Sequence, residues 1–364
     1  MSAELLAGNA QVLSWLKKCV RGSGLDASHI DFPGQIMFSR HGNDIRMTMC
    51  GKSMGYIEET TADVETPLNM QDNDAAFEAW ALILHTYCGA SIQLALDNNV
   101  NLPDSDGILL SGGRSYTYGH YNRFLYRVMK FRKQFPWFEV SDNSLTRAVD
   151  QFEQALQDSV FCNNSASIEA AEYPPGQEAA VEAAFGRADQ PLLAELAQAQ
   201  GVTVPALYRH LPVGLFLTES KAKPSPQTSV FVGKGASIDL WSLADHDLLI
   251  YELKTNNEMV GIITELMFYA NYVYDMFVDR DNKWNPREVR KDHRGRLILW
   301  NKYKEKSLTG VRAFMLADEL HPLITLKVIE AMKSGCIQYG ALNYEWNHAK
   351  NSENVSILNI KGYF

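Results

Sequence analysis

Two apolar segments joined by a polar turn constrain the fold of this 364-residue chain more than any other feature. The segments are Ser237–Leu243 and Leu248–Lys254, and the turn is Ala244-Asp245-His246-Asp247. Apolar runs of this length on either side of a short polar turn predict an antiparallel β-hairpin. If the hairpin is symmetric about the peptide bond between residues 245 and 246, Asp239 lies directly opposite Glu252 on one face of the sheet.

The charged residues of this hairpin are expected to share one buried face. Lys254 lies two residues after Glu252 and therefore points to the same side. The flanking residues are apolar, so two carboxylates and an ammonium group would be buried at a cost unless they have partners. Facing carboxylates repel unless a cation lies between them, and acidic oxygens suit Mg²⁺ or Mn²⁺. Such an ion can activate water beside a phosphorus centre, and a lysine can position that water.

The order of these residues, with Asp239 before the hairpin turn and Glu252-x-Lys254 after it, resembles the core of the PD-(D/E)XK nucleases, the restriction-endonuclease-like superfamily. The resemblance covers residues 177–364 and implies a mixed sheet flanked by helices that hydrolyses phosphodiester bonds with a divalent metal. It also implies that Asp239 and Glu252 are the metal ligands and that Lys254 is the catalytic lysine. Ile238 stands where the family name has proline, at a position that varies widely in the family.

The resemblance gives roles to two helices as well. Many members add a metal-binding acid from the helix before the hairpin, and Glu182 is the first candidate, with Glu178 and Glu195 as alternatives. Glu265 and Tyr269 are four residues apart and share one face of the helix after the hairpin. RecB-like and lambda-exonuclease-like branches carry Gln-x-x-x-Tyr there, near the active site, and this chain has Glu in place of Gln. Both residues are therefore candidate catalytic residues.

The pattern along the whole chain predicts an α/β protein with an α+β N-terminal region. A linker is predicted over 166–176, where small polar residues precede Pro174-Pro175-Gly176. This Pro-Pro-Gly run cannot continue a helix or a central strand. We therefore expect an N-terminal region of unknown role at 1–165 and a nuclease-like domain at 177–364.

Besides a short helix at about Ala3–Val20, two helices are predicted in the N-terminal region. The first follows the apolar run from Ala75 to Ala95. The second runs from His120 to Gln134 and has a basic face formed by Arg123, Arg127 and Lys130. That face is interpreted as a solvated surface, and the alternative is a surface that contacts phosphates.

Charge argues against general affinity for nucleic acid, because 34 Lys and Arg face 43 Asp and Glu, a net charge of −9. The segment Asp279–Lys306 is locally basic and carries interleaved aromatic residues such as Trp284 and Trp300. Basic side chains neutralise phosphates and aromatic rings stack on bases, although a solvated loop is the competing interpretation. The candidate nucleic-acid-binding residues are Lys234, Arg287, Arg290, Lys291 and Arg294.

These observations favour a Mg²⁺- or Mn²⁺-dependent nuclease that acts on DNA rather than RNA, in DNA defence or repair. One alternative is an inactive nuclease-fold module that binds nucleic acid or protein. Another is an enzyme whose site lies near Arg114, His120 and Tyr121. No apolar run is long enough to span a bilayer and no leader pattern opens the chain, which favours a cytoplasmic protein. Homo-oligomerisation is left open.

Overall fold

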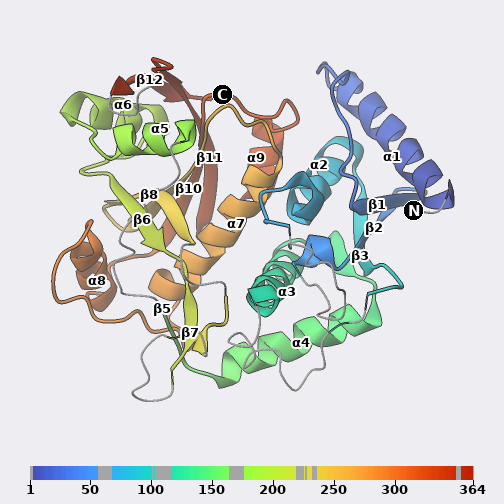
Figure 1. The fold of residues 1–364 in the computed structure, drawn as a ribbon, viewed down its shortest axis with the longest axis horizontal. Coiled ribbons are helices and arrows are strands. Elements are labelled where there is room, and N and C mark those ends of the chain that lie inside the picture. Colours follow the sequence, from blue (N-terminus) through green and yellow to red (C-terminus); the bar gives the residue numbers. More distant parts are fainter. Residues whose placement is uncertain are drawn as a thin grey trace.

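The computed structural model describes residues 3–55, 68–100, 102, 116–163, 176–218, 225, 228–231, 236–349 and 354–363. The described residues form a mixed α/β structure (Figure 1). A six-stranded sheet belongs to the C-terminal part of the chain, and a four-stranded sheet belongs to the N-terminal part.

The six-stranded sheet consists of β6 (Tyr208–Pro212), β8 (Ser237–Ala244), β9 (Asp247–Lys254), β10 (Gly310–Ala317), β11 (Ile337–Trp346) and β12 (Ile357–Gly362). Their order across the sheet is β12-β11-β10-β9-β8-β6. The strands β6, β8 and β9 are antiparallel neighbours, β9, β10 and β11 run parallel, and β12 returns antiparallel to β11. Parallel neighbours need a crossover connection, and helices supply it on both occasions.

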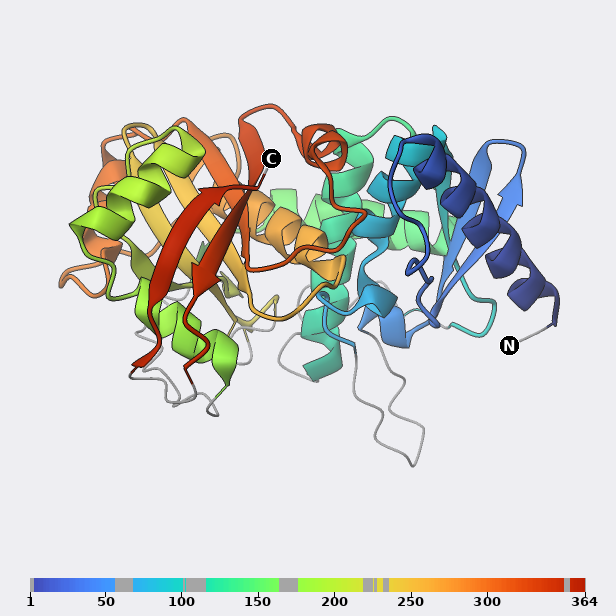
Figure 2. The same cartoon turned by 90° about the horizontal axis from the view of Figure 1, so that it is seen from above.

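Alternating side chains give this sheet two buried faces. Leu249 and its alternate neighbours pack against α5 (Gln177–Phe185) and α6 (Gln190–Gln200). Ile250 and its alternate neighbours belong to the core on the opposite face, where α7 (Gly261–Val273) lies. Figure 2 shows α7 and the pair α5 and α6 on opposite sides of the sheet. Both strands of the predicted hairpin are therefore interior, as their apolar sequence requires.

The helix α7 is apolar around most of its circumference, which is the pattern of a helix buried on all sides. It lies between the six-stranded sheet and the helices α2 (Phe77–Cys88) and α3 (Tyr116–Gln134) (Figure 1). Gly261 opens α7, and a Cβ atom at this position would lie 1.7 Å from the carbonyl oxygen of Gln71. Only glycine permits so close an approach of the helix to the N-terminal half. A π-helical turn at Tyr274–Val278 continues α7.

The N-terminal half contains the other sheet, in the order β1-β2-β3-β4. Antiparallel pairing joins β1 to β2, and parallel pairing joins β2 to β3 and β3 to β4. Its elements are α1 (Ala3–Gly22), β1 (Ile36–His41), β2 (Asp44–Met49), the 3-10 turns Lys52–Met54 and Asn73–Ala75, β3 (Ser91–Leu96), β4 (Phe138–Val140) and α4 (Asn143–Asp158).

One apolar core extends through both halves of the chain. It contains residues of α2 and α3 together with residues of α7, β9 and β10. The short strand β5 (Phe161–Asn163) pairs with β7 (Leu215–Leu217), which adds main-chain hydrogen bonds between the halves. The predicted linker at 166–176 lies outside the described residues except for Gly176, and the division into domains stays a prediction.

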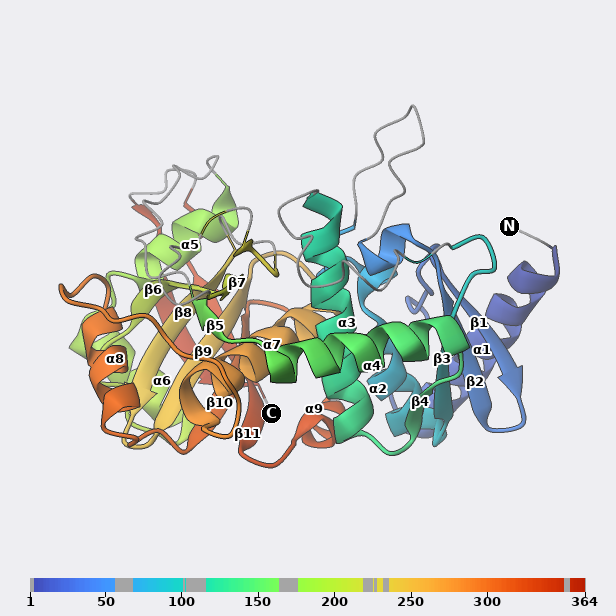
Figure 3. The same ribbon diagram turned by 90° about the horizontal axis from the view of Figure 1, so that it is seen from below.

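The segment after α7 is more ordered than a simple loop. Asp279–Lys306, interpreted from the sequence as a polar insertion, contains α8 (Arg296–Lys304). Figure 3 shows α8 beside the β6 edge of the large sheet. The short helix α9 (Leu326–Met332) connects β10 to β11. No helix in the described parts of the chain is both long and apolar enough to cross a bilayer.

The single helix predicted from Ala75 to Ala95 is correct for its first part, which forms α2, and wrong for its end, which forms β3. The run divides into α2 and β3 at Gly89, which has a φ of 65° and closes α2 by donating to the carbonyl oxygen of His85. Glycine favours this left-handed conformation at the end of a helix, and it was the signal for a break.

The basic face of α3 is neither a solvated surface nor a phosphate-contacting surface. Arg127 is 6% exposed and forms a bidentate ion pair with Glu78 of α2, at 2.7 and 2.5 Å. Lys130 donates to Asp275 at 2.6 Å, and Arg123 is buried beside His120. These cations therefore hold α3 against other elements of the interior.

Candidate active site

The hairpin has the register that its sequence predicts. Leu240 pairs with Tyr251 and Ala244 with Asp247, and the same spacing continued by one residue places Asp239 opposite Glu252. The ladder between the two strands ends at Leu240, and the carboxylate of Asp239 accepts the backbone N–H of Leu253 at 2.9 Å. The strands therefore separate at this end, and the side chain of Asp239 replaces a main-chain partner.

Lys254 joins the hairpin to α7 through two carboxylates. Its Nζ lies 2.6 Å from Oε1 of Glu252 and 3.2 Å from Oε2 of Glu265. Glu252 is 2% exposed and Lys254 is 5% exposed, whereas Asp239 is half-buried. The contact between Lys254 and Glu252 confirms that the two side chains lie on one face of β9. Asp239 is therefore the most exposed of these three residues.

Negative charge exceeds positive charge at this site. Burial raises the pKa of Asp239 to about 8, against the opposing effect of Lys254. Burial also raises the pKa of Glu252, and the nearby Asp239 and Glu265 raise it further. For Lys254, burial lowers the pKa, but Glu252, Glu265 and Asp239 outweigh it and raise the pKa well above its usual value. One ammonium group thus serves three carboxyl groups.

Glu265 and Tyr269, the two residues predicted on α7, lie next to these groups. Tyr269 is 6% exposed, and burial followed by the charge of Glu265 raises the pKa of its hydroxyl. The α7 face that carries both residues therefore faces the hairpin.

The N-terminal half reaches the same helix. Asn73 Oδ1 accepts the backbone N–H of Val260, immediately before α7, at 3.0 Å. Asp72 lies near Glu265, whose charge contributes to the raised pKa of Asp72 after the larger effect of burial. Neither residue was identified from the sequence, because 187 positions separate Asn73 from Val260 and no local pattern links them.

The three acids considered on the helices before the hairpin occupy different places. Glu182 is engaged by His210 and by Arg209 Nε at 2.8 Å, and these partners hold its pKa below the usual value although burial opposes them. Glu178 lies nearer Lys254 and Glu265, and burial raises its pKa. Glu195 accepts the backbone N–H of Ile360 at 3.3 Å, in β12. The structure thus brings Glu178 and Glu182 to the site and places Glu195 against a different strand.

His210 lies within β6, beside the site. The β6–β8 register pairs Arg209 with Leu240 and Leu211 with Ile238, so His210 falls opposite Asp239. Its φ of 58° is unusual for a residue with a side chain, and it is 3% exposed. Strained backbone of this kind tends to occur at functional sites.

Two carboxylates of this arrangement fit a divalent metal ion. Oε2 of Glu252 is buried and has no hydrogen-bond partner among the described residues. Asp239 lies opposite and keeps some solvent exposure. A cation between the two carboxylates would offset the burial and the nearby negative charges that raise both pKa values. Within the described residues, no group of three or more His, Cys, Asp and Glu side chains has the geometry of a metal site. The fit therefore rests on two acidic ligands, with water filling the other positions, as Mg²⁺ commonly binds.

The predicted nucleic-acid-binding residues are spread over the segment before α8. Arg290 and Lys291 are exposed, and Arg290 pairs with Glu288 at 3.3 Å. The backbone N–H of Arg287 donates to Asn163 at 2.8 Å, and Arg294 is half-buried. Lys234 lies outside the described residues.

Trp284 is unavailable for stacking on a base, because it is 4% exposed and packs in the shared core. The alternative enzyme site in the N-terminal half is only partly described, since Arg114 lies outside the described residues. His120 and Tyr121 are buried in α3, and burial followed by the charge of Arg123 lowers the pKa of His120 to about 3.

Comparison of the chain with protein-family models, with curated proteins and with solved structures finds no match in any of the three.

Proposed function

We propose that this protein is a Mg²⁺- or Mn²⁺-dependent nuclease of the PD-(D/E)XK kind, acting on DNA in preference to RNA. The observation that supports it is the meeting of Asp239, Glu252 and Lys254 on one face of a hairpin, beside Glu265. The order of elements that the resemblance implies supports a restriction-endonuclease-like fold. A leading helix, the hairpin, α7, β10, α9 and β11 follow one another in that order.

Each residue has a defined part in this proposal. Asp239 and Glu252 would hold the metal ion, and the bound ion would supply charge neutralisation and an activated water. Lys254 would orient the attacking water and stabilise negative charge on the phosphate, because its ammonium group is fixed by Glu252 and Glu265. Glu265 sets the position of the lysine from α7. Tyr269 would hydrogen-bond a substrate oxygen or water from the same helix face.

Cleavage assays on single- and double-stranded DNA and on RNA, with Mg²⁺ or Mn²⁺ and with EDTA, test the proposal. We expect cleavage by the wild type with metal, and a loss of at least about 100-fold in Asp239→Asn and Lys254→Ala, as for loss of a group that stabilises transition-state charge. Asp245→Asn, in the exposed hairpin turn, and Lys327→Ala, on the surface of α9, are matched controls that should cut normally. Unchanged cleavage in both site variants would refute the assignment.

The second candidate is an inactive module of the same fold that binds nucleic acid or protein. The near-complete burial of Glu252 and its ion pair with Lys254 favour it, because the lysine already neutralises one of the proposed ligands. Calorimetric titration with Mn²⁺ separates the two candidates. Wild-type binding of Mn²⁺ that disappears in Asp239→Asn supports the nuclease. Absence of Mn²⁺ binding and of cleavage, with retained DNA binding, supports the module.

A further inference from the structure

The turn that leads into α8 concentrates positive charge. Arg296 is 7% exposed, and its Nη2 contacts Nδ1 of His293 at 2.8 Å. Arg294 lies between them with a φ of 55°, and Gly295 follows with a φ of 75°. Two successive left-handed residues bring Arg294 and Arg296 close together. Burial lowers the pKa of Arg296, and the charge of Arg294 lowers it further.

One nitrogen atom of the Arg294 guanidinium group lacks a hydrogen-bond partner among the described residues. This atom, Nη1, is inaccessible to solvent. Asp292, the acid within the turn, accepts the backbone N–H of Leu297 at 3.0 Å and so caps α8. A buried guanidinium N–H without an acceptor is uncommon in proteins and indicates a water or anion at that place.

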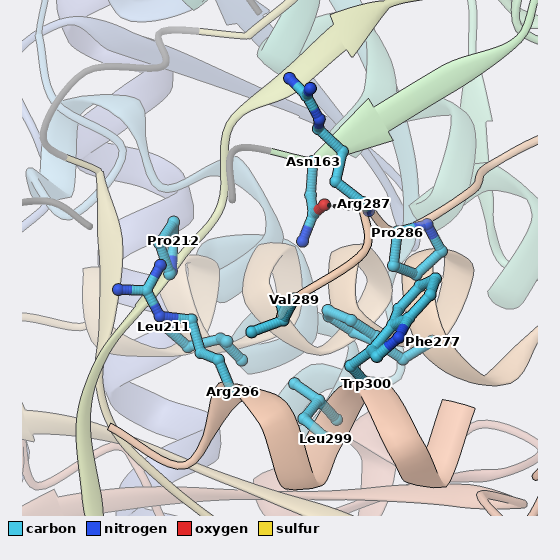
Figure 4. A pocket seen from close by; sticks show the side chains of 10 residues that line it. All are labelled: Asn163, Leu211, Pro212, Phe277, Pro286, Arg287, Val289, Arg296, Leu299 and Trp300. Carbon is cyan, nitrogen blue, oxygen red and sulfur yellow. Dashed lines mark hydrogen bonds between the residues drawn. The ribbon is translucent and has the colours of Figure 1, made fainter. Parts of the chain in front are cut away.

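The turn lies beside the proposed active site. A Cβ atom on Gly295 would lie 2.6 Å from the ring of Tyr208, so the turn is pressed against β6. Tyr208 pairs with Trp241 of β8, and their rings are 4.8 Å apart. Trp241 is two residues from Asp239 on the same face of β8, a distance of ~7 Å along the strand. Figure 4 shows the side chain of Arg296 rising from the start of α8 towards Leu211 and Pro212 on the same edge strand.

We propose that Arg294 and Arg296 form a binding site for a backbone phosphate of nucleic acid, flanking the bond that is cut. The proposal rests on the proposed function for the identity of the ligand. A phosphodiester oxygen would accept from the half-buried guanidinium group of Arg294, whose Nη1 has no hydrogen-bond partner among the described residues. The planar guanidinium groups suit two oxygens of one phosphate. The contacts that lead from Gly295 through Tyr208 to Trp241, two residues from Asp239, suit a neighbouring position on the same strand.

Binding of a fluorescent DNA oligonucleotide to the full chain in EDTA, measured by anisotropy over a range of salt concentrations, tests this site without cleavage. We expect Arg294→Gln to weaken binding by about tenfold and to reduce the salt slope by about one. Lys327→Gln, an exposed lysine on α9, should change affinity by less than about twofold. Equal affinity and equal slope in Arg294→Gln and the wild type would overturn the proposal.

A second measurement avoids dependence on one variant. Phenylglyoxal modifies accessible arginines. Mass spectrometry of the wild type should show that the oligonucleotide protects Arg294, whereas the exposed Arg21 of α1 is modified at its ordinary rate. Protection by inorganic phosphate, with none by the oligonucleotide, would identify a free-anion site and overturn the nucleic-acid assignment. If Arg294→Gln weakens DNA binding while no substrate is ever cut, the phosphate site stands and the nuclease fails. If Asp239→Asn abolishes cleavage while Arg294→Gln binds normally, the nuclease stands and this site fails.

Discussion

The buried ion pair between Glu78 and Arg127 allows the coupling between the halves of the chain to be measured. The side chains of both residues are almost fully buried, and Glu78 accepts hydrogen bonds from Arg127 and, at 3.2 Å, from Thr264 of α7. Thr264 precedes Glu265 of the proposed active site. Glu78 therefore links α3 and α2 to the helix that carries Glu265.

Replacement of Glu78 by Gln leaves the charge of Arg127 buried without a carboxylate. Breaking a buried pair from one side costs about 3–5 kcal/mol, because the remaining charge keeps its desolvation penalty. We expect urea denaturation to show a loss of that size in Glu78→Gln. The double variant Glu78→Gln/Arg127→Met should cost about 2 kcal/mol less than the sum of the single variants, since no charge remains unpaired.

An exposed pair gives the matched control. Glu345 and Lys361 lie 3.3 Å apart on β11 and β12, and both side chains are exposed. Glu345→Gln should therefore change the free energy of unfolding by less than about 1 kcal/mol. The coupling would be refuted if Glu78→Gln lowered the free energy of unfolding by less than about 1 kcal/mol. It would also be refuted if the loss in the double variant equalled the sum of the losses in the single variants.

Two further predictions concern stability. Burial lowers the pKa of His321 to about 4, from 6.5 in the unfolded chain, so the unfolded state binds an extra proton between these values. The free energy of unfolding therefore falls as pH drops through that window. Urea denaturation at several pH values should show a slope of this free energy against pH that is smaller in His321→Gln, by at most about 1.4 kcal/mol per pH unit. Equal slopes in the variant and the wild type would contradict this prediction. Asn73→Ala should lower the free energy of unfolding by about 1 kcal/mol and speed hydrogen exchange at the Val260 amide, because it removes the acceptor of that N–H. Asn359→Ala, at an exposed position, should leave this exchange unchanged. Unchanged exchange in Asn73→Ala would refute the stabilising role of this hydrogen bond.

The parts of the fold predicted correctly depend on neighbours in sequence. The hairpin register follows from a short turn and two apolar strands, so Asp239 and Glu252 could be paired from the sequence alone. The division between α5 and α6 has an equally local cause, because Gly186 directly follows α5 and Pro191 lies in the first turn of α6. In each case the deciding residues lie within a few positions of one another.

Errors arose where the deciding partner is distant in sequence. The basic face of α3 could not be recognised as buried, because Glu78 is 49 residues from Arg127 and Asp275 is 145 residues from Lys130. The partners of Glu182 were equally hidden, since Arg209 lies 27 residues away. From the sequence alone a charged side chain is assigned to the surface, because its counter-ion is unknown. Only the tertiary structure identifies that counter-ion.

The enclosure of α7 has a consequence for any attempt to shorten the protein. A fragment beginning at residue 177 would keep the hairpin and its charged residues but would lose the helices that cover the outer side of α7. The exposed apolar face of α7 would cause the fragment to aggregate or to unfold, and Glu265 would no longer be held in position. Only the intact polypeptide is therefore a sound starting point for measuring catalysis.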